Sequence, residues 1–448
     1  MEKTARRESL KTLITLAIPV MLEQILTQLL QYVDTAMVGR LGAQATSSVS
    51  LTTTVNWLIG NVFASVGIAV VAMVSSAYGA GNRGKIGRVT SQAVLYIAVS
   101  GLAVGSLAVG LSPFIPVWMQ ADASTQHQAS LYFRIISIPM VFKASSIICA
   151  SALRAVKNTR TPMVINLAAN VVNVVLNYLL IYTAGLGVTG AAIATAVSCV
   201  IAGLSMFIVM LRSRVLGCSL KGAGFDRNVF REMRSISLPA LATSMVSCMG
   251  HVVFASLVSS LGTTVFAAHS IALSAESLFY LPGFGLRSAT STLIGISVGE
   301  DDRDKFRVVE HQSMVLTVGM MAFTGLMLFL FARPIMAIFS PDDEVIALGA
   351  RVLRLIAVSE PLFGLMIVSE GIYHGLGQTK VTFVVATIGA WGIRILFTIL
   401  CVHVFHASLF EVWICMFADN SFRAIAMAIP LLSGRDVRYF DRRRSGML

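Results

Sequence analysis

Charged residues are scarce in this chain, and their scarcity excludes most soluble folds. Asp, Glu, Lys and Arg make up 12% of the 448 residues, against about 25% in a typical soluble domain. Apolar residues make up 56%, and the mean hydropathy is +0.79. This balance places the chain among membrane proteins.

Motifs for covalent, metal or cofactor chemistry are missing as well. No HExxH, GxSxG or paired intramembrane His pattern occurs, so we expect no enzyme, no catalytic residue and no cofactor. The six cysteines are scattered without a CxxC pair, which indicates neither disulfides nor a metal site. The net charge of +12 lacks the aromatic interleaving of a nucleic-acid surface, so we expect no nucleic-acid partner.

What the chain does have is a repeat at a fixed offset of 220 residues. Pro19 recurs as Pro239, and Arg134 recurs as Arg354. Twelve apolar runs, six per copy, reach the roughly 20 residues that span a bilayer: 10–38, 50–77, 89–112, 130–153, 161–183, 188–211, 235–260, 268–297, 308–332, 346–373, 381–404 and 409–432. We predict an all-α integral membrane protein with 12 transmembrane helices in two pseudo-symmetric six-helix lobes of equal orientation.

Lys and Arg gather at alternate ends of these runs, which predicts the topology. The loops at 113–129 and 184–188 contain neither residue, whereas 212–234 and the tail are basic. The positive-inside rule then places both termini in the cytoplasm of a multi-pass protein of the cell membrane. We predict an amino-terminal lobe at 1–211, a cytoplasmic linker at 212–234 and a carboxy-terminal lobe at 235–448, functional as a monomer in the lipid bilayer.

The first run is the most polar, and its polar residues recur at helical spacing. They are Glu23, Gln24, Thr27, Gln28, Gln31 and Asp34. Such a stripe either lines a wet cavity or is satisfied by neighbouring helices. Copy two has Phe254 in place of Asp34 and Thr243 in place of Glu23, which favours a chemical role for the first lobe. Pro19 lies inside this run and predicts a kink or hinge.

The fifth run carries a ladder of amides at spacings of four, three and four. The four residues, Asn166, Asn170, Asn173 and Asn177, fall on one helical face. Their oxygens can coordinate a cation or bind a substrate, or their amides can join helices. Thr195 in the sixth run stays ambiguous between packing and function.

Copy two holds its own intramembrane charges. Glu276 and Arg394 each need a partner or water at depth. Asp419 and Arg423 are spaced for a structural ion pair. The stretch 281–285 (LPGFG) predicts an interruption of its helix.

Together these residues resemble the MATE family, the multidrug and toxic compound extrusion transporters. The resemblance rests on 32–42 (YVDTAMVGRLG), 155–162 (AVKNTRTP), 375–380 (GLGQTK), 190–195 (GAAIAT) and 281–285, and runs from about residue 10 to 432. The DinF-type branch is most similar. The resemblance implies a V-shaped bundle and export of organic, often cationic, small molecules against H+ or Na+, by alternating access.

The resemblance also implies where the coupling ion binds, at Asp34, Asn173, Asn177 and Thr195. The family often has Asp where this chain has Asn177, which weakens a Na+ site and favours H+, although Na+ at Asp34 stays open. We assign these residues to the substrate cavity: Gln24, Gln28, Gln31, Asn170, Glu276 and Arg394. Two alternatives remain, namely a flippase for a lipid-linked or polysaccharide precursor and a non-transporting receptor or scaffold.

Overall fold

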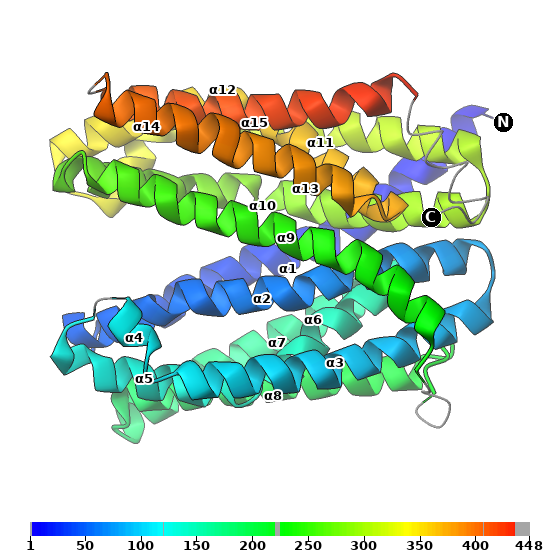
Figure 1. Ribbon diagram of the computed structural model, residues 1–448, viewed down its shortest axis with the longest axis horizontal. Coiled ribbons are helices and arrows are strands. Elements are labelled where there is room, and N and C mark those ends of the chain that lie inside the picture. The colour runs from blue at the N-terminus through cyan, green and yellow to red at the C-terminus, as the bar shows by residue number, and fades with distance from the viewer. Residues whose placement is uncertain (1, 120, 220–224, 406, 435–448) are drawn as a thin grey trace. The chain divides into compact units, whose positions relative to one another are not determined.

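The computed structural model describes residues 2–434, apart from residues 120, 220–224 and 406. Every regular element in that part of the chain is a helix (Figure 1). Long apolar runs without a two-residue alternation favour helices, which satisfy all their backbone hydrogen bonds internally, as a bilayer requires.

The helices follow the two copies of the repeat. The first copy contains α1 (Glu2–Gly39), α2 (Ala43–Gly79), α3 (Arg83–Leu111), α4 (Ile115–Trp118), α5 (Ala123–Ser137), α6 (Met140–Ala155), α7 (Arg160–Asn177), the π-helix η1 (Tyr178–Thr183) and α8 (Gly187–Arg212). The second contains α9 (Arg227–Ser259), α10 (Thr263–Gly299), α11 (Arg303–Phe339), α12 (Asp343–Leu376), α13 (Thr379–Thr387), the π-helix η2 (Ile388–Ile395), α14 (Leu396–His403) and α15 (Leu409–Leu432).

The repeat is preserved in backbone detail. Gly42 and Gly262, 220 residues apart, have φ angles of 109° and 118°, a region that glycine adopts without a steric cost. Each precedes a helix of 37 residues, α2 or α10. A π-helix follows the fifth crossing helix of each copy. The duplication therefore extends from the sequence to the turns and helix irregularities.

The number of membrane crossings agrees with the sequence, but one crossing is broken. Among the described residues, eleven helices are long and apolar enough to span a bilayer, and a bent pair makes a twelfth. That pair, Thr125–Ser137 and Met140–Ala155, turns by 51° where the sequence predicts one run over 130–153. The break lies at Pro139, which has no N–H to continue the helix.

The helices form two compact units. The first unit is Leu22–Ser237, and the second unit is Met1–Met21 together with Leu238–Leu448. This division differs from the predicted lobes, which assign all of 1–211 to the first and treat 212–234 as a linker. Leu16 explains part of the difference, because it is buried in the same core as Leu286. The Gln312 amide also donates to the Arg6 carbonyl at 2.7 Å.

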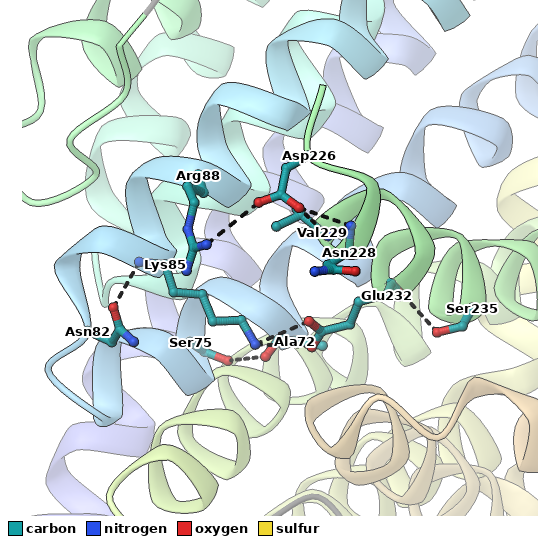
Figure 2. A network of polar contacts seen from close by, with 10 residues as sticks. All are labelled: Ala72, Ser75, Asn82, Lys85, Arg88, Asp226, Asn228, Val229, Glu232 and Ser235. Atoms are coloured by element: carbon teal, nitrogen blue, oxygen red, sulfur yellow. Dashed lines mark hydrogen bonds and ion pairs between the residues drawn. The ribbon is translucent and has the colours of Figure 1, made fainter. Parts of the chain in front are cut away.

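The segment predicted as a linker is fastened to α3 within the first unit. Lys85 Nζ lies 3.1 Å from Glu232 Oε2, and Arg88 Nη1 lies 3.7 Å from Asp226 Oδ2; both contacts are drawn in Figure 2. The Asn82 side chain caps α3 by accepting from the Lys85 N–H at 2.9 Å. These contacts explain why the first unit continues to Ser237.

The interruption expected at 281–285 is absent, because α10 is continuous there with Pro282 inside it. Its glycines serve close packing instead. A Cβ at Gly285 would lie 2.4 Å from the Met21 side chain and 2.9 Å from its backbone nitrogen. The small residues therefore let α10 approach α1 closely within the second unit.

Candidate functional site

The polar residues of α1 and α7 pair one to one along both helices. The Asn166 amide donates to Glu23 at 2.6 Å, and the Asn170 amide donates to Thr27 at 3.1 Å. The Asn177 amide donates to Asp34 Oδ1 at 2.6 Å. Each pair is 143 residues apart, so the two helices run parallel with a constant register. The amide ladder therefore faces α1.

Asp34 lies at the end of this ladder and is held by amides. The Asn173 amide can be placed in two orientations, since its oxygen and nitrogen have the same shape. In the orientation that suits an ionised Asp34, its N–H groups donate to the two carboxylate oxygens at 3.0 and 2.7 Å. Its oxygen then accepts from the Thr195 N–H at 3.2 Å. The structure thus brings together all four residues assigned to ion coupling.

A small cavity of about 80 Å³ opens beside Asp34. Side chains from five helices line it, among them Asp34, Thr46, Thr53, Tyr132, Asn177 and Thr195. The buried Oδ1 of Asn177 has no hydrogen-bond partner among the described residues. The cavity is large enough for water or a small cation, which that oxygen can bind.

Asp34 has no countercharge in the part of the chain that the structure describes. No Lys, Arg or His nitrogen lies within 4.0 Å of its carboxylate there. Glu23 is different, because Arg154 Nη2 contacts its two oxygens at 2.8 and 2.9 Å. The two carboxylates of the polar stripe therefore differ: Glu23 belongs to a buried ion pair, and Asp34 lines a cavity.

The polar stripe of α1 divides into two faces. Gln24, Gln28 and Gln31 lie about 100° around the helix from the face that meets α7. They are partly or fully exposed, and no side-chain hydrogen bond of theirs is found among the described residues. Of the predicted cavity residues in the first lobe, only Asn170 joins the ladder.

A π-helix directly after Asn177 is a feature that sequence reasoning missed. η1 widens the end of the fifth crossing, and the Tyr182 hydroxyl donates to the Met37 carbonyl of α1 at 2.7 Å. A Cβ at Gly190 would lie 2.8 Å from the Leu180 backbone, so α8 packs tightly on this segment. π-helical turns are frequent at functional sites, and no residue pattern in the sequence announces this one.

In the second unit, Arg394 is buried and ion-paired. It lies on η2 with 6% of its surface exposed, and its Nε is 2.9 Å from Asp419 Oδ2. Arg423 contacts the same carboxylate at 2.6 and 2.8 Å, which is the ion pair expected from the sequence. A Cβ at Gly389 would lie 2.2 Å from Asp419 Oδ1, so this cluster is closely packed.

Two carboxyl groups complete the polar core of the second unit. Glu276 is 6% exposed and lies near Arg394. Glu360 is 1% exposed, and neither of its carboxyl oxygens has a hydrogen-bond partner among the described residues. Glu360 and Glu276 interact electrostatically. The sequence pattern predicted a role for Glu276 and none for Glu360, and their proximity depends on the packing of α10 against α12.

Comparison with known proteins identifies the family. A family model described as MatE matches residues 19–179 and 239–400, two stretches that begin 220 residues apart and cover most of the chain. The chain belongs to the MatE family. Members of this MATE family are membrane transporters and not enzymes. The match is to the family as a whole, and assignment to the DinF-type branch stays a prediction.

Relatives and solved structures agree over nearly the full length. The chain is 27% identical to "Probable multidrug resistance protein NorM" of Thermotoga maritima, covering 95% of this chain and 92% of that one. It is 26% identical to multidrug resistance protein MdtK of Edwardsiella ictaluri, covering 85% of each. A structure of an outward-facing multidrug resistance MATE transporter superposes with a TM-score of 0.89 at 20% identity and 97% coverage of both chains. That likeness establishes the fold.

Proposed function

We propose that this MATE protein is a proton-coupled antiporter that exports hydrophobic, often cationic, organic compounds by alternating access. The names of its relatives support drug export. The observation that carries the coupling is Asp34, a carboxylate held by amides beside a cavity, with no countercharge within 4.0 Å among the described residues. The expected location is the cell membrane, with both termini in the cytoplasm.

Protonation of Asp34 changes which amide orientation fits. An ionised carboxylate only accepts hydrogen bonds, so it suits the donating NH2 group of Asn173. A protonated carboxyl carries one O–H donor, which suits the opposite orientation, with the Asn173 oxygen toward Asp34. In that orientation the Asn173 nitrogen faces Ser198 Oγ at 3.3 Å. Asn173 thereby links the charge of Asp34 to α8.

The chemistry of the cavity favours a proton over a sodium ion. A proton needs one basic oxygen, whereas a metal cation needs several oxygen ligands with net negative charge. Among the described residues that line the cavity, Asp34 is the one carboxylate, and Asn177 provides an amide where the family often has an acid. We therefore assign coupling to H+.

We assign the hinge of α1 to Pro19. Residues up to Met21 pack in the second unit, and residues from Leu22 onward carry Asp34 in the first. Proline removes the hydrogen bond to the Thr15 carbonyl, which lowers the cost of bending the helix there. A proton moving through a potential of about 100 mV supplies about 2.3 kcal/mol, enough for roughly fifty-fold accumulation of an uncharged substrate; for a monovalent cation exchanged one for one, the pH gradient supplies the driving force.

Ethidium efflux from proteoliposomes tests this proposal, with pH and Na+ gradients imposed separately. We expect the wild type to respond to the pH gradient. Asp34→Asn keeps the shape of the side chain and removes its ability to carry a proton, so gradient-driven efflux falls at least about tenfold, as for loss of a group essential to proton transfer. Ethidium binding to the purified variant is retained.

Asp304→Asn is the matched control, because Asp304 is exposed in the first turn of α11, far along the chain from the site. Its efflux equals that of the wild type. Wild-type efflux by Asp34→Asn under a pH gradient rules out Asp34 as the coupling site. A wild-type protein that responds only to the Na+ gradient rules out proton coupling.

A further inference from the structure

A basic groove lies in the second unit where α11 ends and α12 and α15 begin. It has a volume of about 650 Å³ and is lined chiefly by three arginines and two phenylalanines, Arg333, Arg351, Arg354, Phe329 and Phe410. The three arginines are exposed. No residue of the ion-coupling site takes part in this groove, so the function proposed above does not explain it.

The arginines form no close ion pair in the described part of the chain. No carboxylate oxygen lies within 4.0 Å of their guanidinium nitrogens there. Arg351 instead lies over the Phe410 ring at 4.4 Å, and Arg354 lies 5.9 Å from the Phe329 ring. Glu411, the acid next to Phe410, accepts a hydrogen bond from Ser408 and interacts electrostatically with Arg351 from beyond ion-pair distance. The groove therefore carries three guanidinium groups beside two phenylalanine rings, with a net positive charge.

Its position along the helices is that of a membrane interface. Arg333 is six residues before the end of α11, and Arg351 is eight residues after the start of α12, which correspond to about 9 and 12 Å along a helix. Exposed apolar side chains continue beyond the groove on both helices, at Leu326, Leu330 and Val358. An arginine at this depth is costly unless an anion or the interface neutralises it.

The repeat supplies an internal comparison. Residues 131–140 and 351–360 have the same sequence of buried and exposed positions, and Arg354 matches Arg134. The counterparts of Arg333 and Arg351 in the first copy, however, are Pro113 and Leu131. A scaffold shared by both lobes does not need the additional arginines. Arg333 and Arg351 also lie at the end of the second unit that is opposite its basic loops. The positive-inside rule predicts few Lys or Arg residues at that end.

We propose that this groove binds the phosphate headgroup of an anionic phospholipid. Guanidinium groups bind phosphate oxygens through paired hydrogen bonds, and three of them match a group of net negative charge. The phenylalanine rings and the apolar surface beyond them contact the glycerol and the acyl chains. A lipid is favoured over a soluble phosphate because the groove continues into apolar surface at membrane depth. With the orientation predicted above, the lipid belongs to the outer leaflet.

Native mass spectrometry of the purified full chain tests the proposal. Delipidated protein receives an equimolar mixture of phosphatidylglycerol and phosphatidylcholine. We expect at least about tenfold preference for phosphatidylglycerol, as for charge-assisted hydrogen bonds to a phosphate. The triple variant Arg333→Gln, Arg351→Gln, Arg354→Gln loses this preference, and millimolar inorganic phosphate does not displace the lipid from the wild type. Arg134→Gln, the matched change in the first copy, keeps the preference.

Three results overturn the proposal: equal binding of both lipids by the wild type, an unchanged preference in the triple variant, and displacement by inorganic phosphate. The last result identifies a soluble phosphate as the ligand. If the triple variant does not fold, the single variants Arg351→Gln and Phe410→Ala are measured instead. Each must lower the preference for phosphatidylglycerol severalfold for the proposal to hold. Lipid binding is measured without transport, so its outcome is separate from that of the Asp34 experiment.

Discussion

The buried pair of Glu23 and Arg154 allows a quantitative test of how the first unit is held together. Glu23 is 6% exposed and accepts three hydrogen bonds, two from Arg154 at 2.8 and 2.9 Å and one from Asn166 at 2.6 Å. Glu23→Leu removes the Glu23 carboxylate from the Arg154 guanidinium, which is 17% exposed. Removing one partner of such a buried pair costs about 3–5 kcal/mol.

Partial exposure of Arg154 places the expected cost at the lower end, about 3 kcal/mol. For a unit of 150–250 residues, about 1 kcal/mol shifts the melting temperature by about 2–4 °C. We therefore expect a decrease of at least about 6 °C in the apparent melting temperature of the detergent-solubilised protein. Intrinsic tryptophan fluorescence during a heating ramp measures it.

The double variant Glu23→Leu, Arg154→Met removes both charges and replaces them with apolar side chains. Its stability should return to within about 1 kcal/mol of the wild type, because a buried pair gains little over apolar packing. Glu232→Gln in the linker contact is the matched control, since both side chains of that pair are about one-third exposed, at 34% and 35%. It should cost less than about 1 kcal/mol. A double variant as unstable as the sum of its single variants would refute the reasoning.

Two further predictions concern the site in each unit. Gly389→Ala forces a Cβ to within 2.2 Å of Asp419 and 2.6 Å of Arg423. We expect it to lower the free energy of unfolding by about 1–3 kcal/mol. Gly392→Ala on the same π-helix is the control, because the nearest atom to its Cβ is 3.8 Å away, and it should lower the free energy of unfolding far less. Asn173→Leu removes the amide that we propose responds to the charge of Asp34. The rate of pH-driven ethidium efflux should therefore fall at least about tenfold, while the melting temperature stays unchanged. Efflux at the wild-type rate would show that Asn173 does not transmit the protonation.

Much of the fold followed from patterns that a single chain carries. The twelve apolar runs match the crossings because uncharged stretches of about 20 residues must become helices in a bilayer. The amide spacing in α7 likewise predicted one polar face, and that face meets α1. The break at Pro139 was not predicted, because proline often sits inside transmembrane helices without breaking them, as Pro282 does here.

The candidate site was only partly predictable, because its partners come from different helices. Asp34 and Asn177 were identified by resemblance, and their 2.6 Å contact depends on the register between α1 and α7. Nothing within α1 distinguishes Glu23 from Asp34, since Arg154 is 131 residues away along the chain. In the sequence, Arg333 and Arg351 are ordinary basic residues near the ends of apolar runs. The groove that they line forms only where α11, α12 and α15 meet, so it could not be predicted.

The repeat explains why the space beside Asp34 is filled at the equivalent position of the second unit. The position of Asp34 is occupied in the second copy by Phe254, which is 2% exposed. Val49, which lines the cavity, corresponds to His269, whose ring lies 5.6 Å from that of Phe254 and accepts a hydrogen bond from Trp413 at 3.2 Å. Aromatic packing therefore fills the space in the second unit that the first unit leaves open. The helix pair of the first unit thus combines a polar ladder with a void, whereas the equivalent positions of the second unit are closed by packed rings.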